Sequence, residues 1–444
     1  MRIIIIGAGE VGRHIARVLC NDNDVIVIES DPERCTMMDE LDVQTLLGNG
    51  ADVKMLTGVL PGADLVVAVT GTDEVNIVAC MASKLITRKG DKIATTIARV
   101  SNPSYIDEPV AERKSIGIDV MICPELTLAL EIAEIVSVPS AMEVVKFSNG
   151  KLEMVEFKVN DDNPFRNKSL VDCNIPASAV VTAIFRKGNV VIPKGDDIIF
   201  LNDRLVILGK PDAMNLIKKI FDENKERTNK VTIIGGGTVG VYLASMLEKQ
   251  EFDIKLVELD ATRCESIAES LPHTLILNGD GMDLSILNDE NIGEMDAVIA
   301  VTQSDEKNLL CALLAKQLGA KKVIARVDKP EYINLFELVG IDVAVSSRQT
   351  TANEVLKTTF GGKVGYITSL EGEKAKVIQL TANDRSKITK KPISKIKFPR
   401  DAIISAIIRG DDVIIPGGTD QVMDGDQVVV FALPAVVSDV ENLF

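Results

Sequence analysis

The chain has 444 residues, of which 46% are hydrophobic and 26% are charged, and its formal net charge is −16. No apolar run reaches the roughly 18 to 20 residues that a membrane-spanning helix needs, so we expect no membrane insertion. The acidic charge disfavours nucleic acid as a partner, because phosphate backbones are bound mainly by cationic side chains. Seven cysteines without a C-x-x-C pair and only two histidines argue against a metal site and favour reduced thiols in the cytoplasm.

The first predicted element is an apolar strand at residues 1–6, which we interpret as a buried strand rather than as a secretion signal. It leads into the turn GAGEVG at residues 7–12 and then into an amphipathic helix, and this context makes G-x-G-x-x-G a dinucleotide-binding pattern. Gly7 permits the tight turn, Gly9 lets the backbone approach a pyrophosphate, and Gly12 lets the helix pack on the strand. The expected nucleotide contacts are Gly7, Ala8, Gly9, Glu10, Val11 and Gly12.

The second predicted strand ends at Glu29, about 20 residues after the turn, where an acidic side chain hydrogen-bonds a ribose diol. A carboxylate at this place repels the 2′-phosphate of NADP, so we expect NAD(H), with ATP or ADP as alternatives. Asp31 could contact ligand too, but we favour its interpretation as the N-cap of the next helix, with Arg34 solvated in the first turn.

Polar residues also follow the next three predicted strands. The loop LLGNGAD at residues 46–52 brings Asn49 and Gly50 to the adenosine side of such a site, and a plain strand-to-helix loop is the alternative. Thr70 follows the fourth strand, at the sheet edge where ligands dock in open α/β sheets. Arg99 ends the fifth strand, where its guanidinium can reach a phosphate or an interdomain carboxylate, or simply form an ion pair.

Two further segments have a structural and a chemical interpretation. Asp73, Glu74 and Asn76 are expected to cap and begin the helix after the fourth strand. Cys123 precedes Pro124 at a strand-to-helix junction, where a helix dipole can activate a thiol. We favour a buried, unreactive cysteine, because the matching stretch of the second half is rich in serine.

The first half of the sequence recurs in the second. MRIIIIGAGEVGRHIARVL at residues 1–19 aligns with KVTIIGGGTVGVYLASML at residues 230–247, and VIVIESDPERC aligns with IKLVELDATRC. Asp260 and Arg263 therefore match Asp31 and Arg34. Both turns are expected to bind nucleotide, and the alternative is that one keeps its glycines only for packing. The expected contacts of the second half are Gly235, Gly236, Gly237, Thr238, Val239, Gly240, Glu258, Gly279, Asp280, Thr302 and Arg326, where Gly236 and Thr238 replace Ala8 and Glu10.

Each α/β unit is followed by short β-branched runs broken by Gly, Asp, Asn and Pro, which predicts a small β-rich domain with hairpins. Residues 188–211 and 410–434, within these stretches, resemble each other. The polar segment at residues 221–230 is the best linker between the halves. We therefore predict α/β domains at residues 1–135 and 229–350 and small β-rich domains at residues 140–222 and 361–444.

These motifs, in this order, resemble the RCK (KTN) family, the regulators of potassium conductance, in its tandem form. The resemblance covers essentially the whole chain and rests on the glycine-rich turns, the VIVIESDPERC segment, the GNGAD loop, the T-x-x-D/E-x-N stretches and their second copies. It implies an α/β protein with two Rossmann-like doubly wound parallel-sheet domains (RCK_N). Each of them is followed by a small β-rich α+β domain (RCK_C).

The resemblance also implies a function. The chain is expected to be a cytoplasmic regulatory subunit that binds NAD(H), ATP or ADP and gates a membrane potassium uptake system. Its partners would be copies of itself and an integral-membrane potassium translocator of the Trk type, which would hold it at the inner face of the cell membrane. An NAD-dependent oxidoreductase and a nucleotide-binding scaffold without gating are the alternatives. We favour a regulator, because the small domains leave little room for a substrate site with a proton donor.

Overall fold

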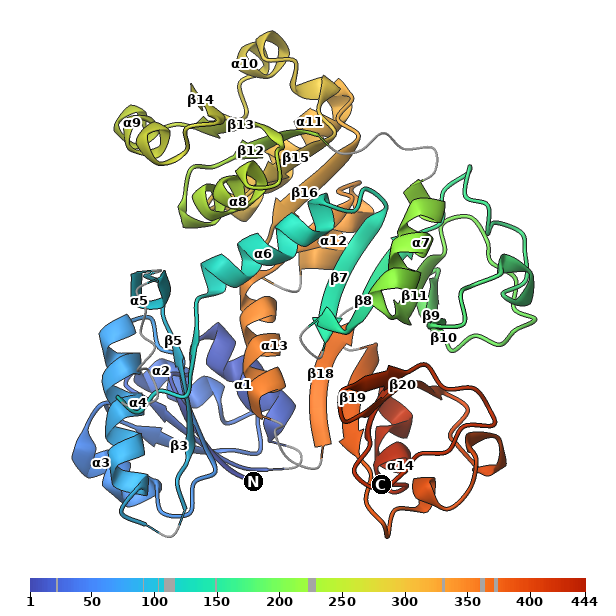
Figure 1. Cartoon of the computed structure of the whole chain (residues 1–444). Helices are drawn as coiled ribbons and strands as arrows, with labels where there is room; N and C mark the ends of the chain where they lie inside the picture. Colours follow the sequence, from blue (N-terminus) through green and yellow to red (C-terminus); the bar gives the residue numbers. More distant parts are fainter. Residues whose placement is uncertain are drawn as a thin grey trace. The chain divides into compact units, whose positions relative to one another are not determined.

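The computed structural model describes residues 1–20, 23–90, 92–102, 104–107, 116–147, 150–222, 229–329, 332–359, 364–370 and 374–444 (Figure 1). Most of the predicted linker, residues 223–228, and the predicted domain start at residue 361 lie outside these residues. The chain forms two compact units. The first contains residues 1–129, 328–330 and 346–359, and the second contains the remainder.

The first unit is built on a six-stranded parallel sheet with the strand order β3-β2-β1-β4-β5-β6. The order reverses after β1, as in a doubly wound Rossmann sheet, so the predicted fold class is confirmed here. Ile3–Ile6 of β1 are buried throughout, because helices cover both faces of a parallel sheet. The strands are β1 (Arg2–Ile6), β2 (Asp24–Glu29), β3 (Gln44–Leu47), β4 (Leu65–Ala68), β5 (Thr95–Arg99) and β6 (Val120–Ile122).

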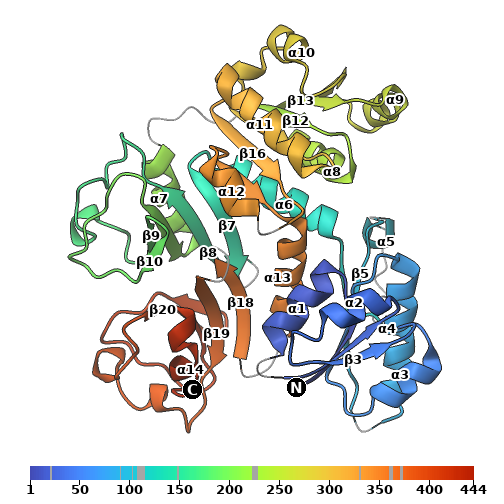
Figure 2. The same ribbon diagram turned by 180° about the vertical axis from the view of Figure 1, so that it is seen from behind.

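Helices α3 and α4 lie on one side of this sheet and α1 lies on the other (Figures 1 and 2). The side of α3 and α4 closes over a core that includes Ile4, Ile26, Leu56, Val66 and Cys80. The helices of this part of the chain are α1 (Glu10–Leu19), α2 (Pro32–Met37), α3 (Val53–Val59), α4 (Asp73–Thr87), α5 (Ser104–Asp107) and α6 (Pro124–Val136).

The second unit repeats the parallel sheet with the order β14-β13-β12-β15-β16-β17. Its strands are β12 (Lys230–Ile234), β13 (Asp253–Glu258), β14 (Thr274–Asn278), β15 (Ala297–Ala300), β16 (Lys322–Arg326) and β17 (Val343–Val345). Its helices are α8 (Thr238–Glu248), α9 (Ala261–Ser270), α10 (Leu284–Asp289), α11 (Asp305–Leu318) and α12 (Ile333–Leu338). The predicted duplication of the Rossmann-like domain is therefore confirmed.

The second unit also holds two five-stranded antiparallel sheets, which confirms the predicted small β-rich domains. Their orders, β10-β9-β11-β8-β7 and β21-β20-β22-β19-β18, match strand for strand. The first sheet contains β7 (Ala141–Phe147), β8 (Leu152–Lys158), β9 (Ala179–Arg186), β10 (Asn189–Val191) and β11 (Arg204–Gly209), followed by α7 (Pro211–Asp222). The second contains β18 (Val364–Leu370), β19 (Ala375–Thr381), β20 (Ala402–Arg409), β21 (Asp412–Ile414) and β22 (Gln427–Ala432), followed by α14 (Val437–Glu441).

The two antiparallel sheets share a hydrophobic core. Phe147, Met154 and Phe185 of the first sheet pack in one cluster with Val377 and Phe431 of the second. The other face of the first sheet is covered by α7, whose Phe221 stacks on Phe157 with ring centroids 4.3 Å apart. Burial of these aromatic and aliphatic side chains stabilises the small domains.

Helix α13 (Ser347–Thr359) follows β17 in the chain but belongs to the first unit. It packs along α1, and the two helices lie side by side in both views (Figures 1 and 2). A segment of the second half of the chain therefore covers the helix that starts at the first glycine-rich turn.

Candidate functional site

The two glycine-rich turns have the same backbone geometry. Gly7 and Gly235 have φ angles of +104° and +115°, which side-chain-bearing residues rarely adopt. A Cβ at Gly12 would lie 1.9 Å from the carbonyl oxygen of Gly7, and one at Gly240 would lie 2.0 Å from that of Gly235. The turns therefore fold back tightly on the first residues of α1 and α8, as the sequence pattern predicts for helix packing.

Glu29 lies at the end of β2 with its carboxylate against the first turn. Its Oε2 accepts a hydrogen bond from the amide of Ala8 at 2.6 Å, and its Oε1 accepts from the amides of Ser30 and Asp31 at 2.6 and 2.9 Å. Burial raises the pKa of Glu29, but these backbone donors outweigh burial, so its pKa lies below the ordinary value. A charged carboxylate is thus held beside the turn.

Glu258 has the equivalent position at the end of β13, with fewer donors around it. Its Oε2 accepts from the amide of Gly236 at 2.7 Å, and its Oε1 accepts from the amide of Asp260 at 2.9 Å. A Cβ at Gly236 would lie 2.5 Å from Cδ1 of Ile267 and 2.9 Å from Oε2 of Glu258, so the missing methyl group of the second turn makes room for both side chains. The replacement of Ala8 by Gly236 therefore changes the packing at this edge.

The two aspartates that follow these acids are helix caps, as predicted. Asp31 accepts from the amide of Glu33 at 2.9 Å, and Asp260 accepts from the amide of Arg263 at 3.0 Å. Arg34 is half-exposed and lies 3.7 Å from Asp31. Arg263 is exposed as expected, but its Nε also donates to the carbonyl oxygen of Gly236 at 2.5 Å, a contact that the sequence did not predict.

The loops after the third strands are ordered by their own side chains. Asn49 accepts from the amide of Ala51 at 2.9 Å, and Asp280 accepts from the amide of Met282 at 3.0 Å. Gly50 is packed against β1, because a Cβ there would lie 2.1 Å from Cγ2 of Ile6.

In the second loop the counterpart of Gly50 is Gly281, whose Cβ would lie 2.3 Å from Cγ2 of Ile234. Gly281 was not singled out from the sequence, although LNGDGMD aligned with LLGNGAD would have found it. Gly279 instead leaves space for Ile286, since a Cβ would lie 2.1 Å from its Cδ1.

Asn76 joins three segments at the carboxyl edge of the first sheet. Its Oδ1 accepts from the amide and the hydroxyl of Thr70 at 2.8 and 2.7 Å, and its Nδ2 donates to the carbonyl oxygens of Thr70 and Arg99 at 3.1 and 2.9 Å. Asn308 makes the same four bonds with Thr302 and the carbonyl of Arg326.

The prediction that Asn76 caps α4 is therefore wrong. The N-cap positions are Thr72 and Ser304, and Asn76 and Asn308 are buried inside the helices. The prediction that Asp73 and Glu74 begin the helix is confirmed, since both lie in the first turn of α4. The Asp73 carboxylate does not cap the helix, because it accepts from the amides of Ser101 and Asn102, both at 2.8 Å.

Arg99 extends from the end of β5 on the same edge of the sheet. Its Nη2 donates to Ser101 Oγ at 3.4 Å, and its buried Nε has no hydrogen-bond partner among the described residues. A buried guanidinium nitrogen without a partner fits an anionic group that the chain does not itself supply.

Cys123 is not an activated thiol. Its side chain is buried, and burial raises the pKa of the thiol to about 11. The alternative of a buried, unreactive cysteine is the one that the geometry supports. Within the described part of the chain, no group of three or more His, Cys, Asp or Glu side chains can hold a metal ion, and no helix is long and apolar enough to cross a membrane.

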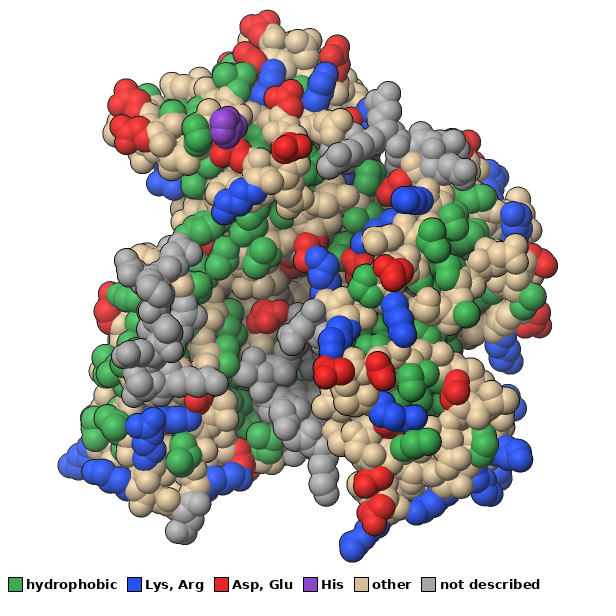
Figure 3. Space-filling view, in the orientation of Figure 1, with side chains coloured by type: hydrophobic (Ala, Val, Ile, Leu, Met, Phe, Trp, Pro, Cys, Tyr) green, Lys and Arg blue, Asp and Glu red, His purple; other side chains and the backbone are tan. Residues whose placement is uncertain are grey.

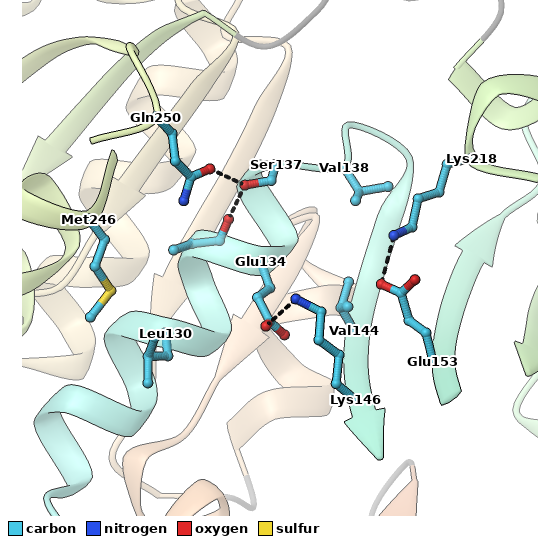
Figure 4. Close-up of a pocket in the computed structure, with 11 residues that line it drawn as sticks. Leu130, Glu134, Ser137, Val138, Val144, Lys146, Glu153, Lys218, Met246 and Gln250 are labelled. Carbon is cyan, nitrogen blue, oxygen red and sulfur yellow. Dashed lines mark hydrogen bonds and ion pairs between the residues drawn. The ribbon is translucent and has the colours of Figure 1, made fainter. Parts of the chain in front are cut away.

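A separate cavity of about 340 Å³ lies within the second unit, between the end of α6, strands β7 and β8, and helices α7 and α8 (Figure 4). Its charged side chains are paired, since Lys146 lies 2.8 Å from Glu134 and Lys218 lies 2.6 Å from Glu153. Because each lysine faces a carboxylate, the cavity offers no excess charge for an ionic ligand.

The charges on the visible face of the molecule are mixed rather than segregated. Lys and Arg side chains alternate with Asp and Glu side chains over that face (Figure 3). This pattern resembles an ordinary solvated surface more than the concentrated basic surface of a nucleic-acid-binding protein.

Both family models that match the chain occur twice. The TrkA-N domain model matches residues 3–124 and 231–347, and the TrkA-C domain model matches residues 154–222 and 377–444. These matches follow the alternation of the two parallel and two antiparallel sheets along the chain.

Relatives match over the full length. The "Trk system potassium uptake protein TrkA homolog 2" of Methanosarcina mazei is 52% identical over 447 residues, and the "Trk system potassium uptake protein TrkA homolog" of Archaeoglobus fulgidus is 40% identical over 445 residues; each match covers 100% of both chains. Among solved structures, the GsuK channel bound to NAD matches with a TM-score of 0.63 at 17% identity, over 100% of this chain and 78% of that chain. This last likeness is one of fold.

Proposed function

This chain belongs to the TrkA family, and we propose that it is a nucleotide-sensing regulatory subunit of a membrane potassium uptake system. Its relatives at 52% and 40% identity carry the name of a Trk potassium uptake protein. In this proposal the chain works as a homo-oligomer in the cytoplasm. It is held at the inner face of the membrane by an integral-membrane potassium translocator, and it catalyses no reaction.

The observation that carries the proposal is the pair of acids beside the two turns. Glu29 and Glu258 each lie at the end of the second strand of a Rossmann sheet and touch the glycine-rich turn of that sheet. This is the place of the acid that binds the ribose diol of a dinucleotide. The GsuK channel bound to NAD has the same fold, which supports NAD(H) as the ligand, with ATP or ADP as alternatives that share the adenosine half.

Several residues would share the work of holding the nucleotide. The amides at the start of α1 and α8 would bind phosphate oxygens, because helix N-termini present unpaired N–H groups. Glu29 and Glu258 would face the ribose, and the orphaned Nε of Arg99 fits a phosphate or another anion at the carboxyl edge. Thr70 and Thr302 would act mainly through their loops, since their hydroxyls are bonded to Asn76 and Asn308.

Regulation would follow from a difference in affinity between two arrangements of the chain. A nucleotide that binds one arrangement more tightly shifts the population toward it, and the attached translocator responds to that shift. No covalent change of the nucleotide is needed. The glycine-rich turns and the acids would bind the signal, and the contact with the translocator would transmit it.

Calorimetric titration of the full chain with NADH, NAD, ATP, ADP and NADPH tests the input. We expect NADH or an adenine nucleotide to bind and NADPH to bind at least tenfold more weakly, because its 2′-phosphate would face Glu29 or Glu258. Glu29→Gln and Glu258→Gln should each reduce the difference in affinity between NADH and NADPH at its own turn. Equal binding of NADPH and NADH to the wild-type chain would contradict the ribose-facing role of the acids.

Two further measurements separate the regulator from the oxidoreductase and the scaffold. The absorbance of bound NADH should stay constant over hours in the presence of oxidisable and reducible small molecules, whereas an oxidoreductase would change it. Potassium flux through a reconstituted translocator should depend on nucleotide only when the chain is added. A flux that ignores the nucleotide would leave the scaffold as the better description.

A further inference from the structure

The first glycine-rich turn has a basic residue from another part of the chain at its phosphate end. Arg348, the second residue of α13, places its Nη1 3.7 Å from Oε2 of Glu10. Glu10 is the first residue of α1 and follows Gly9, the N-cap of that helix. The guanidinium of Arg348 therefore lies at the N-terminal end of α1, where a Rossmann turn binds a pyrophosphate.

We infer that Arg348 is a phosphate-binding residue of the first nucleotide site, and that it forms an ion pair with Glu10 while no phosphate is bound. The inference rests on the proposed function, because it assigns a further contact to the same nucleotide. It differs from the assignment of the glycines and of Glu29 in that Arg348 comes from the second half of the chain.

The Glu10–Arg348 pair is weak enough to be exchanged. Its closest atoms are 3.7 Å apart, and the Glu10 side chain is 62% exposed, so water and salt screen the attraction. A diphosphate carries more charge than one carboxylate and offers several oxygens, two of which a planar guanidinium can bind at once. A nucleotide phosphate at the start of α1 would therefore displace Glu10 from Arg348.

The second turn lacks the matching carboxylate. Thr238 stands in the place of Glu10, and the residue that aligns with Arg348 is Glu125, the second residue of α6. The exchange is thus a property of the first site alone, and the two sites should differ in how strongly phosphate charge contributes to affinity.

The consequence for regulation is that a nucleotide at the first turn holds α13. This helix packs along α1 and follows directly on β17, the last strand of the second parallel sheet. Nucleotide bound at the first site would contact α13 through Arg348. Because α13 belongs to the second half of the sequence, binding at the first site would be coupled to the position of a segment of the second half.

The test is a titration of the full chain with adenosine, AMP and ADP in a Glu258→Ala background, which weakens the second site. Arg348→Gln should weaken ADP about tenfold, the worth of one charge-assisted hydrogen bond to phosphate, and should leave adenosine unchanged. Glu10→Gln should tighten ADP about threefold by releasing Arg348, and this gain should vanish in the Glu10→Gln, Arg348→Gln double variant. Arg17→Gln is the matched control, because it removes the same charge from an exposed position at the far end of α1.

The outcomes separate the two proposals. If ADP binds the background chain but Arg348→Gln and Arg17→Gln bind it equally well, the role of Arg348 is overturned and the nucleotide sensor stands. An equal loss of adenosine and ADP in Arg348→Gln would also overturn it, because a structural disturbance does not follow the phosphate count. If no adenine nucleotide binds the wild-type chain, both proposals fall. Thermal unfolding without ligand shows whether the variants remain folded.

Discussion

The two antiparallel sheets share one ion pair, between a buried aspartate and a partly exposed arginine, and differ in another. In the first sheet Arg186 binds Asp203 through two nitrogens at 2.8 and 2.6 Å, and in the second Arg409 binds Asp426 with both contacts at 2.8 Å. Each aspartate is almost fully buried and also accepts an amide from its own loop. A pair repeated with this fidelity in both halves belongs to the fold.

The second pair exists in the first sheet only. Glu156 and Arg204 lie 3.2 Å apart, and Arg204 also lies 3.6 Å from Glu337 of α12. The aligned positions of the second sheet hold Gln379 and Gln427, which are joined by a neutral hydrogen bond of 2.7 Å. The two halves thus share the same arrangement of strands, but only the first sheet has a buried ion pair at these positions.

The largest effect is expected where the halves agree. Arg186→Met and Arg409→Met each leave a buried aspartate without its cation, which should cost about 3 kcal/mol of unfolding free energy in either half. Chemical denaturation measures both variants. The double variant Arg186→Met, Asp203→Asn should lose clearly less than Arg186→Met alone, because no unpaired charge remains. A large loss in one half and none in the other would break the equivalence of the two sheets.

The buried asparagines give a second test of equivalence, in the parallel sheets. Asn76→Ala and Asn308→Ala each leave one amide, one hydroxyl and two carbonyl groups without their partner, so we expect each to lower the unfolding free energy by about 2 kcal/mol. Asn76→Asp is the matched control, since it keeps the acceptor oxygen for Thr70 but loses the donor to both carbonyls. It should fold less stably than the wild type.

For nucleotide binding, the asparagine variants should weaken the site of their own half. The loop after β4 is tied to the end of β5 through Asn76, and its release would let Thr70 and Arg99 move apart. A variant that loses stability but binds NADH or ADP as tightly as the wild type would show that this edge of the sheet does not shape the site.

The features that could be predicted from the sequence are those that local pattern controls. The apolar strand followed by G-x-G-x-x-G predicts both the turn and the close packing of Gly12, and Asp31 predicts a cap, because each depends on residues within one turn of chain. The duplication made the same prediction twice, so the two Rossmann sheets and the two small sheets followed from repeated motifs.

Long-range contacts could not be predicted in the same way. Asn76 meets Arg99 only because β4 and β5 are neighbours, and Glu156 meets Arg204 only through the pairing register of β8 and β11. Arg348 is further removed, since its contact with Glu10 requires that α13 pack on α1. In each case the residue type signals a polar role, but the partner is set by tertiary packing.

The smallest effect is expected where the halves differ. Glu156→Gln with Arg204→Gln gives the first sheet the neutral pair of the second. Replacing a buried ion pair by a neutral pair of similar size is often close to neutral, so we expect a change within about 1 kcal/mol near pH 7. Arg204→Gln alone should cost more, because Glu156 then stays buried without its cation.

The pH dependence sharpens this comparison. Burial is the main cause that raises the pKa of Glu156 and of Glu337, against the lowering effect of Arg204. An acid whose pKa is raised by folding binds more protons in the folded state, so its contribution to stability is present below the unfolded pKa and is lost as the pH rises through the folded pKa. Unfolding free energies measured upward from pH 4.5 should therefore fall less steeply in Glu156→Gln than in the wild type, because Glu156 no longer titrates and Arg204 still lowers the pKa of Glu337. Gln379→Glu with Gln427→Arg is the reciprocal exchange in the second sheet, where Gln427 is exposed and Gln379 is partly exposed, and it should leave the slope unchanged. Parallel slopes for the wild type and Glu156→Gln would mean that Glu156 is as well solvated as the glutamines of the second sheet. The buried charge would then make no difference to the stability of the two halves.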